Sequence, residues 1–367
     1  MRPRLSTGTD QRDVDREGNG DERGREASHP QDIPAAGWRD IFARVKKEIG
    51  IDHVSLVAAG LAMYALLAVF PGLAAAVAIY GIFASPAGAI DHMQSLSGVL
   101  PPGTWDLFAS QLQTLAGQAQ SSLSVTALAG IAVALWGAKA GISALMVATN
   151  IAYAEPERRS FVRQTILSLV FTVVAVVGFL VVLGVGVVLP VALEVFGTSG
   201  WVQTLAGVLR WVLLWLIAAI GFSALYRYAP SRHRARWRWV TWGSALAATL
   251  WILVSVGFAF YVSTFASYGK TYGALGGVIA LLMWFYLSSF TIIVGAEVNS
   301  EMERQTKRDT TEGPEAPLGA RGAFAADTVG PDAAAVKKAA DSEVQAGKPA
   351  ISERSRPGAG NSGSRGA

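Results

Sequence analysis

Residues 165–193 read TILSLVFTVVAVVGFLVVLGVGVVLPVAL, a stretch of 29 residues without a charged side chain. A helix needs about 20 apolar residues to cross the hydrocarbon of a membrane. The stretch is too uniformly apolar to form one face of a soluble amphipathic helix. Its residues do not alternate apolar with polar at a period of two, as the strands of a membrane barrel do. Because lipid offers the backbone no other hydrogen-bond partners, this stretch predicts a transmembrane helix.

Five further apolar stretches have the same character. The 367-residue chain is 51% hydrophobic and only 16% charged, whereas soluble domains usually carry about 25% charge. We therefore expect an all-α integral membrane protein whose transmembrane domain, residues 37–304, is a bundle of six helices. The six predicted spans are residues 56–82, 124–149, 165–193, 211–226, 240–264 and 274–298.

Positive charge is sorted between the two sides of the predicted bundle. Fifteen Lys and Arg residues flank the spans on one side, whereas the other side carries only Arg210 and Lys270. Because cytoplasmic loops collect Lys and Arg, this asymmetry places both termini in the cytoplasm. The fifteen are Arg39, Arg44, Lys46, Lys47, Arg158, Arg159, Arg163, Arg227, Arg232, Arg234, Arg236, Arg238, Arg304, Lys307 and Arg308.

The segments outside the spans differ from one another in composition. Residues 1–36 and 305–367 are polar and contain few large apolar side chains, so they predict disordered cytoplasmic tails. Residues 37–50 combine apolar positions at helical spacing with cations, which is typical of an interfacial helix on an anionic leaflet. Residues 85–123 contain no Lys or Arg, and we expect short helices there on the outer surface.

The usual signatures of catalysis and metal binding are missing from the sequence. There is no cysteine, and the four histidines lie far apart, so a thiolate or imidazole metal site is not expected. No phosphate-binding loop, nucleophile elbow or dinucleotide fingerprint is present. The sequence therefore predicts no enzyme activity, no catalytic residue, no metal and no cofactor.

A basic stretch with interleaved aromatic residues, Arg227–Trp239, falls between the fourth and fifth spans. Such a composition can bind nucleic acid. In a loop beside the membrane, however, positive charge is already required by topology and is attracted to anionic lipid. We expect membrane lipids, anionic on the cytoplasmic face, as the partner of this loop, and no nucleic acid.

The first span contains Pro71 followed by Gly72. Proline removes a helix hydrogen bond and clashes with the preceding turn, so a kink or break is expected. A broken helix could line a substrate site near the middle of the membrane. The alternative is a kink that only helps a long helix to fit the bundle.

Lys139 is the one ionisable residue near the centre of a predicted span. Charges at this depth usually face the bundle interior and mark a pathway or an ion pair. Gly137 and Gly141 flank it at a spacing that allows two helices to approach closely. Pro71, Gly72, Gly137, Lys139 and Gly141 are therefore the candidate substrate pathway. A lysine held by backbone carbonyls or a small water cavity is the structural alternative.

Polar residues also gather at the predicted cytoplasmic ends of the second and sixth spans. Opposite charges at one depth predict ion pairing, for example of Glu297 with Arg158 or Arg159. The pair could be a latch that fixes helix ends, or a gate that opens during transport. The candidate cytoplasmic network comprises Asn150, Tyr153, Glu155, Glu157, Arg158, Arg159, Glu297 and Asn299.

Several separated motifs resemble one bacterial family. AAGLAMYALLAVFPGL at residues 58–73 and ALWGAKAGISALMVATNIAYAEPERRSF at residues 134–161 are similar to the YihY/BrkB family, and the resemblance extends over residues 38–303. It implies a multi-pass protein of the bacterial inner membrane. The family has been labelled both a virulence-associated serum-resistance factor and, wrongly, ribonuclease BN. The position of Lys139 is more often small or polar in that family, which argues against a family-wide role for the charge.

Taken together, these features predict a non-enzymatic protein that transports solutes or handles lipids in the cell envelope. The alternative is a structural or envelope-assembly partner associated with virulence or serum resistance. A homo-oligomer or an envelope protein partner is compatible with either function. Ribonuclease activity is not expected, because no cluster of metal-binding histidines is present.

Overall fold

The computed structural model describes residues 22–83, 125–185, 200–265 and 274–347. Within these ranges the regular structure is helical, and a single isolated bridge pairs Ala235 with Thr311. The long helices are α2 (Ala35–Ile51), α3 (Val54–Phe83), α6 (Val125–Ala152), α7 (Phe161–Leu183), α9 (Gly200–Tyr228), α10 (Trp237–Phe265) and α12 (Ala274–Glu303). Shorter elements are η1 (Pro30–Asp32), α13 (Phe324–Asp327) and α14 (Ala333–Gly347).

Each predicted span overlaps a helix, although residues 186–193 of the third span lie outside the described residues. Four described helices are long and apolar enough to cross a membrane. These four are Phe161–Val182, Gly200–Tyr228, Trp237–Ser263 and Gly276–Glu303. Residues Ala35–Ile51 and Val54–Val69, which meet at 63°, make a fifth candidate if they are counted as one bent span. The predicted outer segment, residues 85–123, lies outside the described residues. A total of six spans and the cytoplasmic placement of the termini stay predictions.

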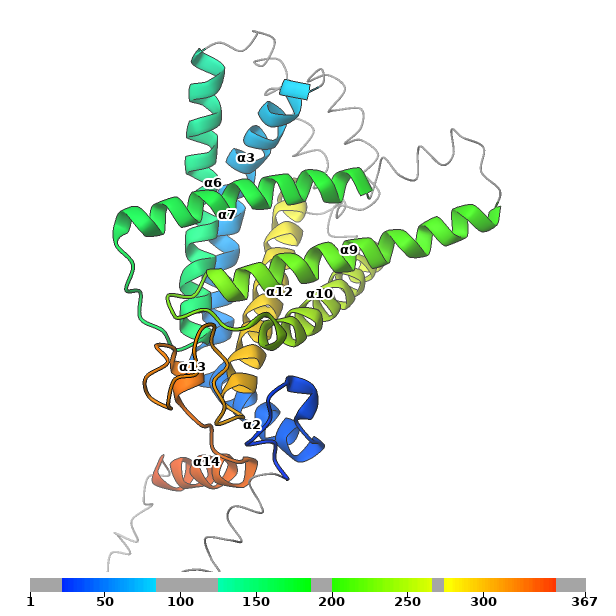
Figure 1. The fold of residues 1–367 in the computed structure, drawn as a ribbon. Coiled ribbons are helices and arrows are strands. Elements are labelled where there is room, and N and C mark those ends of the chain that lie inside the picture. The colour runs from blue at the N-terminus through cyan, green and yellow to red at the C-terminus, as the bar shows by residue number, and fades with distance from the viewer. Residues whose placement is uncertain (1–21, 84–124, 186–199, 266–273, 348–367) are drawn as a thin grey trace, which may run out of the picture.

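The long helices form a central bundle with others packed across it (Figure 1). α3, α6 and α12 contact one another along the middle of the molecule, while α10 packs against α12 and α9. α7 packs against α6, and both α7 and α9 run obliquely across the bundle in this view. α2, α13 and α14 gather at one end of the bundle.

α3 runs without interruption through Pro71. The predicted break is therefore absent. Gly137 of α6 lies so close that a Cβ there would be 3.0 Å from the Pro71 ring. Tight packing of a neighbouring helix is a known way for membrane helices to tolerate proline.

The prediction of disordered tails is wrong for residues 22–36 and 305–347, which are folded against the bundle. The Lys307 N–H donates to the Arg25 carbonyl at 2.8 Å, and the Thr306 hydroxyl donates to the Ala27 carbonyl at 2.7 Å. The Arg236 N–H donates to the Thr310 carbonyl at 2.9 Å. Composition misses this order because it comes from long-range hydrogen bonds and from a few small apolar side chains, such as Ala27 and Ala325, that pack into the core. Residues 1–21 and 348–367 lie outside the described residues.

Burial is concentrated at the end of the bundle where these segments meet. One cluster of buried apolar side chains includes Val54, Met146 and Tyr226, from three different helices. A second joins Ile41 of α2 with Trp239 of α10 and the side chains of α12 next to them. The lateral faces of α7, α9 and α10 instead expose many large apolar side chains, as expected of surfaces that contact lipid.

Candidate functional site

The "polar end" of the bundle is where α2, the start of α3, and the last turns of α6, α9 and α12 meet segments 22–34 and 304–333. Three acidic residues of α12, Glu297, Glu301 and Glu303, point into it, and each is 1% exposed. Buried carboxylates are costly unless they are paired or protonated. The partners of these three residues therefore define the chemistry of the polar end.

Two of the three acids are neutralised by arginines. Glu301 pairs with Arg44 of α2 and with Arg304. Arg44 also donates to the Gln305 side chain at 2.8 Å. Glu303 pairs with Arg232 at 2.6 Å. These pairs tie α2, α12 and the loop before α10 together.

Glu297 differs because the ionisable side chain with which it interacts most strongly is another acid. Its carboxyl lies within hydrogen-bonding reach of Asp52, the residue that follows α2. Glu297 Oε1 has no hydrogen-bond donor in the part of the chain that the structure describes. Burial raises the pKa of the Asp52 carboxyl. Its contacts with Glu297 and His53 lower this pKa by a smaller amount, so the net shift is upward. Two acids this close can bond only when one of them carries a proton.

The predicted pairing of Glu297 with Arg158 or Arg159 is wrong. Arg159 binds Glu157 instead, with Nε and Nη2 each 2.7 Å from a carboxylate oxygen. The hydrogen bond from the Arg159 side chain lowers the pKa of Glu157 to about 2. Asn150 donates to the same carboxylate at 3.0 Å.

The rest of the predicted network is distributed over several contacts. Asn150 Oδ1 accepts from the Ser231 N–H at 2.8 Å, and the Arg158 N–H donates to the Ser231 hydroxyl at 3.0 Å. Glu155 accepts from the Phe324 N–H at 2.6 Å. The structure thus brings the end of α6 against the loop after α9 and the segment that contains α13.

Tyr153 and Asn299 occupy the buried centre of the polar end. The Arg232 guanidinium lies 4.8 Å from the centre of the Tyr153 ring, and burial raises the pKa of Tyr153. Asn299 accepts from the Gly243 N–H at 3.0 Å and donates to the Val240 carbonyl at 3.2 Å. Asn299 therefore fastens α12 to α10, and its side chain also lies near Tyr153 at the end of α6.

Pro71, Gly137 and Gly141 of the candidate pathway are helix-packing positions. A Cβ at Gly141 would be 3.1 Å from Ala68 Cβ, so Gly137 and Gly141 allow α3 and α6 to approach closely. Gly72 lies within α3. Lys139 Nζ lies 4.4 Å from the Trp136 ring and 5.9 Å from the Phe161 ring. These aromatic faces stabilise the ammonium by cation–π interaction.

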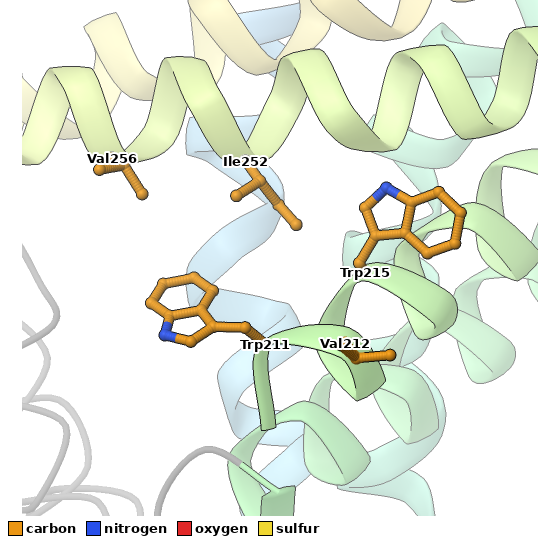
Figure 2. A pocket seen from close by; sticks show the side chains of 5 residues that line it. All are labelled: Trp211, Val212, Trp215, Ile252 and Val256. Atoms are coloured by element: carbon orange, nitrogen blue, oxygen red, sulfur yellow. The ribbon is translucent and has the colours of Figure 1, made fainter. Parts of the chain in front are cut away.

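An apolar groove lies between α9 and α10 (Figure 2). Trp211, Val212 and Trp215 face Ile252 and Val256 across it, and its volume is about 540 Å³. The indole N–H of Trp215 donates to the Thr249 hydroxyl at 3.0 Å. Sequence reasoning missed this groove, although two tryptophans four residues apart in a predicted span were a signal for it.

Most arginines of the basic stretch contact protein. Arg227 pairs with Glu312, and Arg236 Nε donates to the Thr311 carbonyl at 2.8 Å. Arg232 pairs with Glu303, as described above. Arg234 is exposed, with its guanidinium 5.0 Å from the Tyr228 ring. The stretch therefore holds the segment after α12 and leaves only part of its charge for other partners.

Sequence reasoning also missed Asp52, Arg44, Glu301 and Glu303. Glu301 follows Glu297 by four residues, which puts both acids on one face of a helix. That spacing was a signal for a larger acidic cluster. The position of Asp52 had no comparable signal, because it depends on the bend between α2 and α3.

The fold and the polar end define a class of protein, a helical membrane protein whose helices are joined by ion pairs at one end. Residues 45–319 match the family described as Virulence factor BrkB, and the chain belongs to this family. It is thus a membrane protein of a family whose activity is unknown. No solved structure matches the chain.

Three curated relatives illustrate the range of similarity. YfkH of Bacillus subtilis, which its name describes as ribonuclease-like, is 39% identical over 48% of this chain and 66% of its own length. A UPF0761 membrane protein of Tolumonas auensis is 32% identical over 36% of this chain and 44% of its own. One of Vibrio cholerae is 34% identical over 30% of this chain and 38% of its own. The matched segments thus span between 38% and 66% of these relatives.

Proposed function

We propose that this protein handles or transports lipid in the bacterial inner membrane, with an anionic lipid as its substrate. The apolar groove between α9 and α10 carries this proposal. Its lining consists of two tryptophans and three aliphatic side chains, which suits an acyl chain. The surrounding helix faces expose further apolar side chains such as Leu216 and Phe260, so a lipid tail can enter from the side.

The ends of the helices near the groove supply positive charge for a headgroup. Trp215 lies 12 residues before Arg227 on α9, a distance of about 18 Å at helical rise. This matches the depth of one membrane leaflet, about 15 Å of hydrocarbon plus the headgroup layer. Arg234, which is exposed just beyond the end of α9, is suitably placed to contact an anionic headgroup.

Reconstitution into liposomes that contain a fluorescent anionic phospholipid tests the proposal. We expect faster movement of the lipid between leaflets than in empty vesicles. Ile252→Trp, which fills the groove, should slow this movement several-fold. Leu253→Trp is the matched control, because Leu253 is 62% exposed and does not line the groove. Movement no faster than in empty vesicles would contradict the proposal and favour the structural or envelope-assembly role.

A lipid with a photoreactive tail gives an independent test of the binding position. Crosslinks should fall on the α9 and α10 peptides that contain Trp211, Trp215 and Val256. Crosslinks spread evenly over all lipid-facing helices would argue that the groove binds no particular lipid.

A further inference from the structure

The junction between α2 and α3 is short and sharply bent. Only Asp52 and His53 separate Ile51, the last residue of α2, from Val54, the first residue of α3. The two helices meet at 63°. His53 has a φ of 48°, in the left-handed region that non-glycine residues seldom adopt. A few residues at the end of an element that hold such a conformation are typical of a hinge.

The hinge is held against α12 through Asp52 and Glu297. Glu297 is 1% exposed, and its Oε1 has no donor among the described residues. Neither acid has a Lys, Arg or His within ion-pair distance in the described ranges, since Arg44 and Arg304 are directed at Glu301. This arrangement differs from every other buried acid of the polar end, all of which contact arginine or backbone N–H groups.

The surroundings of the pair add negative charge. The negative charges of Glu48 of α2 and Glu301 of α12 both repel the Glu297 carboxylate. The Arg304 side chain lies 3.6 Å from the Glu48 carboxylate. Lys47 lies near Glu48, His53 lies near Asp52, and Tyr153, at the end of α6, lies near Glu297. Two unscreened carboxylates side by side repel each other, so one proton between them is what keeps the contact closed.

We propose that Asp52 and Glu297 form a proton-binding site, which holds one proton between the two carboxyl groups and releases it when the hinge moves away from α12. A proton fits better than a metal ion, since no group of three or more metal-binding side chains occurs in the described part of the chain. Loss of the proton leaves two adjacent negative charges and moves Asp52, at the end of α2, away from Glu297, while the Arg44–Glu301 pair still joins α2 to α12. Return of a proton closes the contact again.

The proton could drive lipid movement, and this step rests on the proposed function. The binding of the proton by Asp52 and Glu297 does not depend on that function. A site that is occupied in one conformation and empty in another couples the conformational change to the proton gradient. For one proton, a difference of one pH unit biases the cycle by up to about tenfold. The proton gradient would then be the energy source of the movement.

Infrared spectroscopy of the full-length protein at about pH 7, recorded as the difference between the unmodified protein and each variant, tests the binding of the proton directly. We expect the C=O stretch of a protonated carboxyl group in the unmodified protein, and its loss in both Glu297→Gln and Asp52→Asn. Glu315→Gln is the matched control, since it removes the same charge at an exposed position and should keep the band. Two variants are used because a substitution at buried Glu297 could disturb folding. Asp52 is only partly buried, so Asp52→Asn should fold normally. Persistence of the band in both variants would overturn the proposal.

Liposomes with an imposed pH gradient test the coupling. Lipid movement by the unmodified protein should change up to about tenfold per pH unit, whereas Glu297→Gln should move lipid at one rate with or without the gradient. Dependence on sodium at constant pH, or no response to the gradient, would overturn the coupling. Failure of lipid movement under all conditions would instead count against the proposed function, and the infrared band would still decide whether the proton site exists.

Discussion

The polar end and the lateral faces of α7, α9 and α10 are built on opposite principles. At the polar end, most buried charges have an oppositely charged partner, and segments from both ends of the chain pack together. On the lateral faces, large apolar side chains such as Val170, Ile220 and Phe260 are exposed. One region is therefore specified by individual contacts, whereas the other requires only sufficient apolar surface for lipid.

Removal of one member of a buried ion pair should have the largest effect. Arg44 and Glu301 are 2% and 1% exposed, and an unpaired charge in such a place costs about 3–5 kcal/mol. We expect Arg44→Ala to lower the free energy of unfolding by this amount, measured by thermal or denaturant unfolding in detergent. Arg39→Ala, at an exposed position of the same helix, should stay within about 0.5 kcal/mol. A similar decrease in the free energy of unfolding in both variants would contradict the difference between buried and exposed charges.

Two glycines of α10, one at the polar end and one on a lateral face, allow the two regions to be compared within a single helix. A Cβ at Gly243 would collide with the Asn299 side chain, whereas a Cβ at Gly257 would meet nothing within 4 Å. Gly243→Ala should destabilise the protein by about 1–3 kcal/mol. Gly257→Ala should be neutral or stabilise it by up to about 1 kcal/mol, because alanine favours the helix. Unfolding midpoints of the two variants measure the difference, and equal midpoints would contradict it.

Replacement of Lys139 should affect transport more than stability. Its cation–π contacts with Trp136 and Phe161 stabilise by about 1 kcal/mol. Lys139→Ala should therefore preserve folding but slow the movement of anionic lipid in liposomes. Lys139→Arg, which keeps the charge, should restore the rate. Loss of expression in Lys139→Ala would show that the lysine is structural.

Acid should weaken the Glu157–Arg159 contact, and we expect this effect to be the smallest. The pKa of Glu157 falls from 4.5 to about 2 on folding, so the contact stabilises the folded state at neutral pH. That contribution is lost as the pH falls from about 4.5 toward about 2. Because Glu157 is exposed, the effect should be a fraction of a kcal/mol. As the pH is lowered across this range, the unfolding midpoint should fall less steeply in Glu157→Gln than in the unmodified protein. The same slope in both proteins would show that the Glu157–Arg159 pair does not contribute to stability.

The helices were predictable because their signal is local. Every predicted apolar stretch overlaps a helix, since length and uniform hydropathy are sufficient for that inference. The boundaries were less predictable: α9 begins at Gly200 rather than at residue 211, because Gln203, Thr204 and Arg210 lower the hydropathy without opposing a helix.

Contacts at the candidate site were less predictable because they join distant segments. Glu297 was identified from its position, yet its neighbour is Asp52 rather than Arg158 or Arg159. Which acid meets which cation depends on the bend at His53 and on the folding of residues 305–333 against α10. Neither is visible in a hydropathy pattern.

The long-range pairs of the polar end also set an order of events during biosynthesis. Arg44 is translated 257 residues before Glu301, a delay on the order of tens of seconds at ribosomal rates of about 5–20 residues per second. During this time α2 has no ion-pair partner from α12, although the helices before α12 can already enter the membrane. Assembly of this end of the protein therefore follows insertion, and a nascent chain is exposed to chaperones and proteases until α12 emerges.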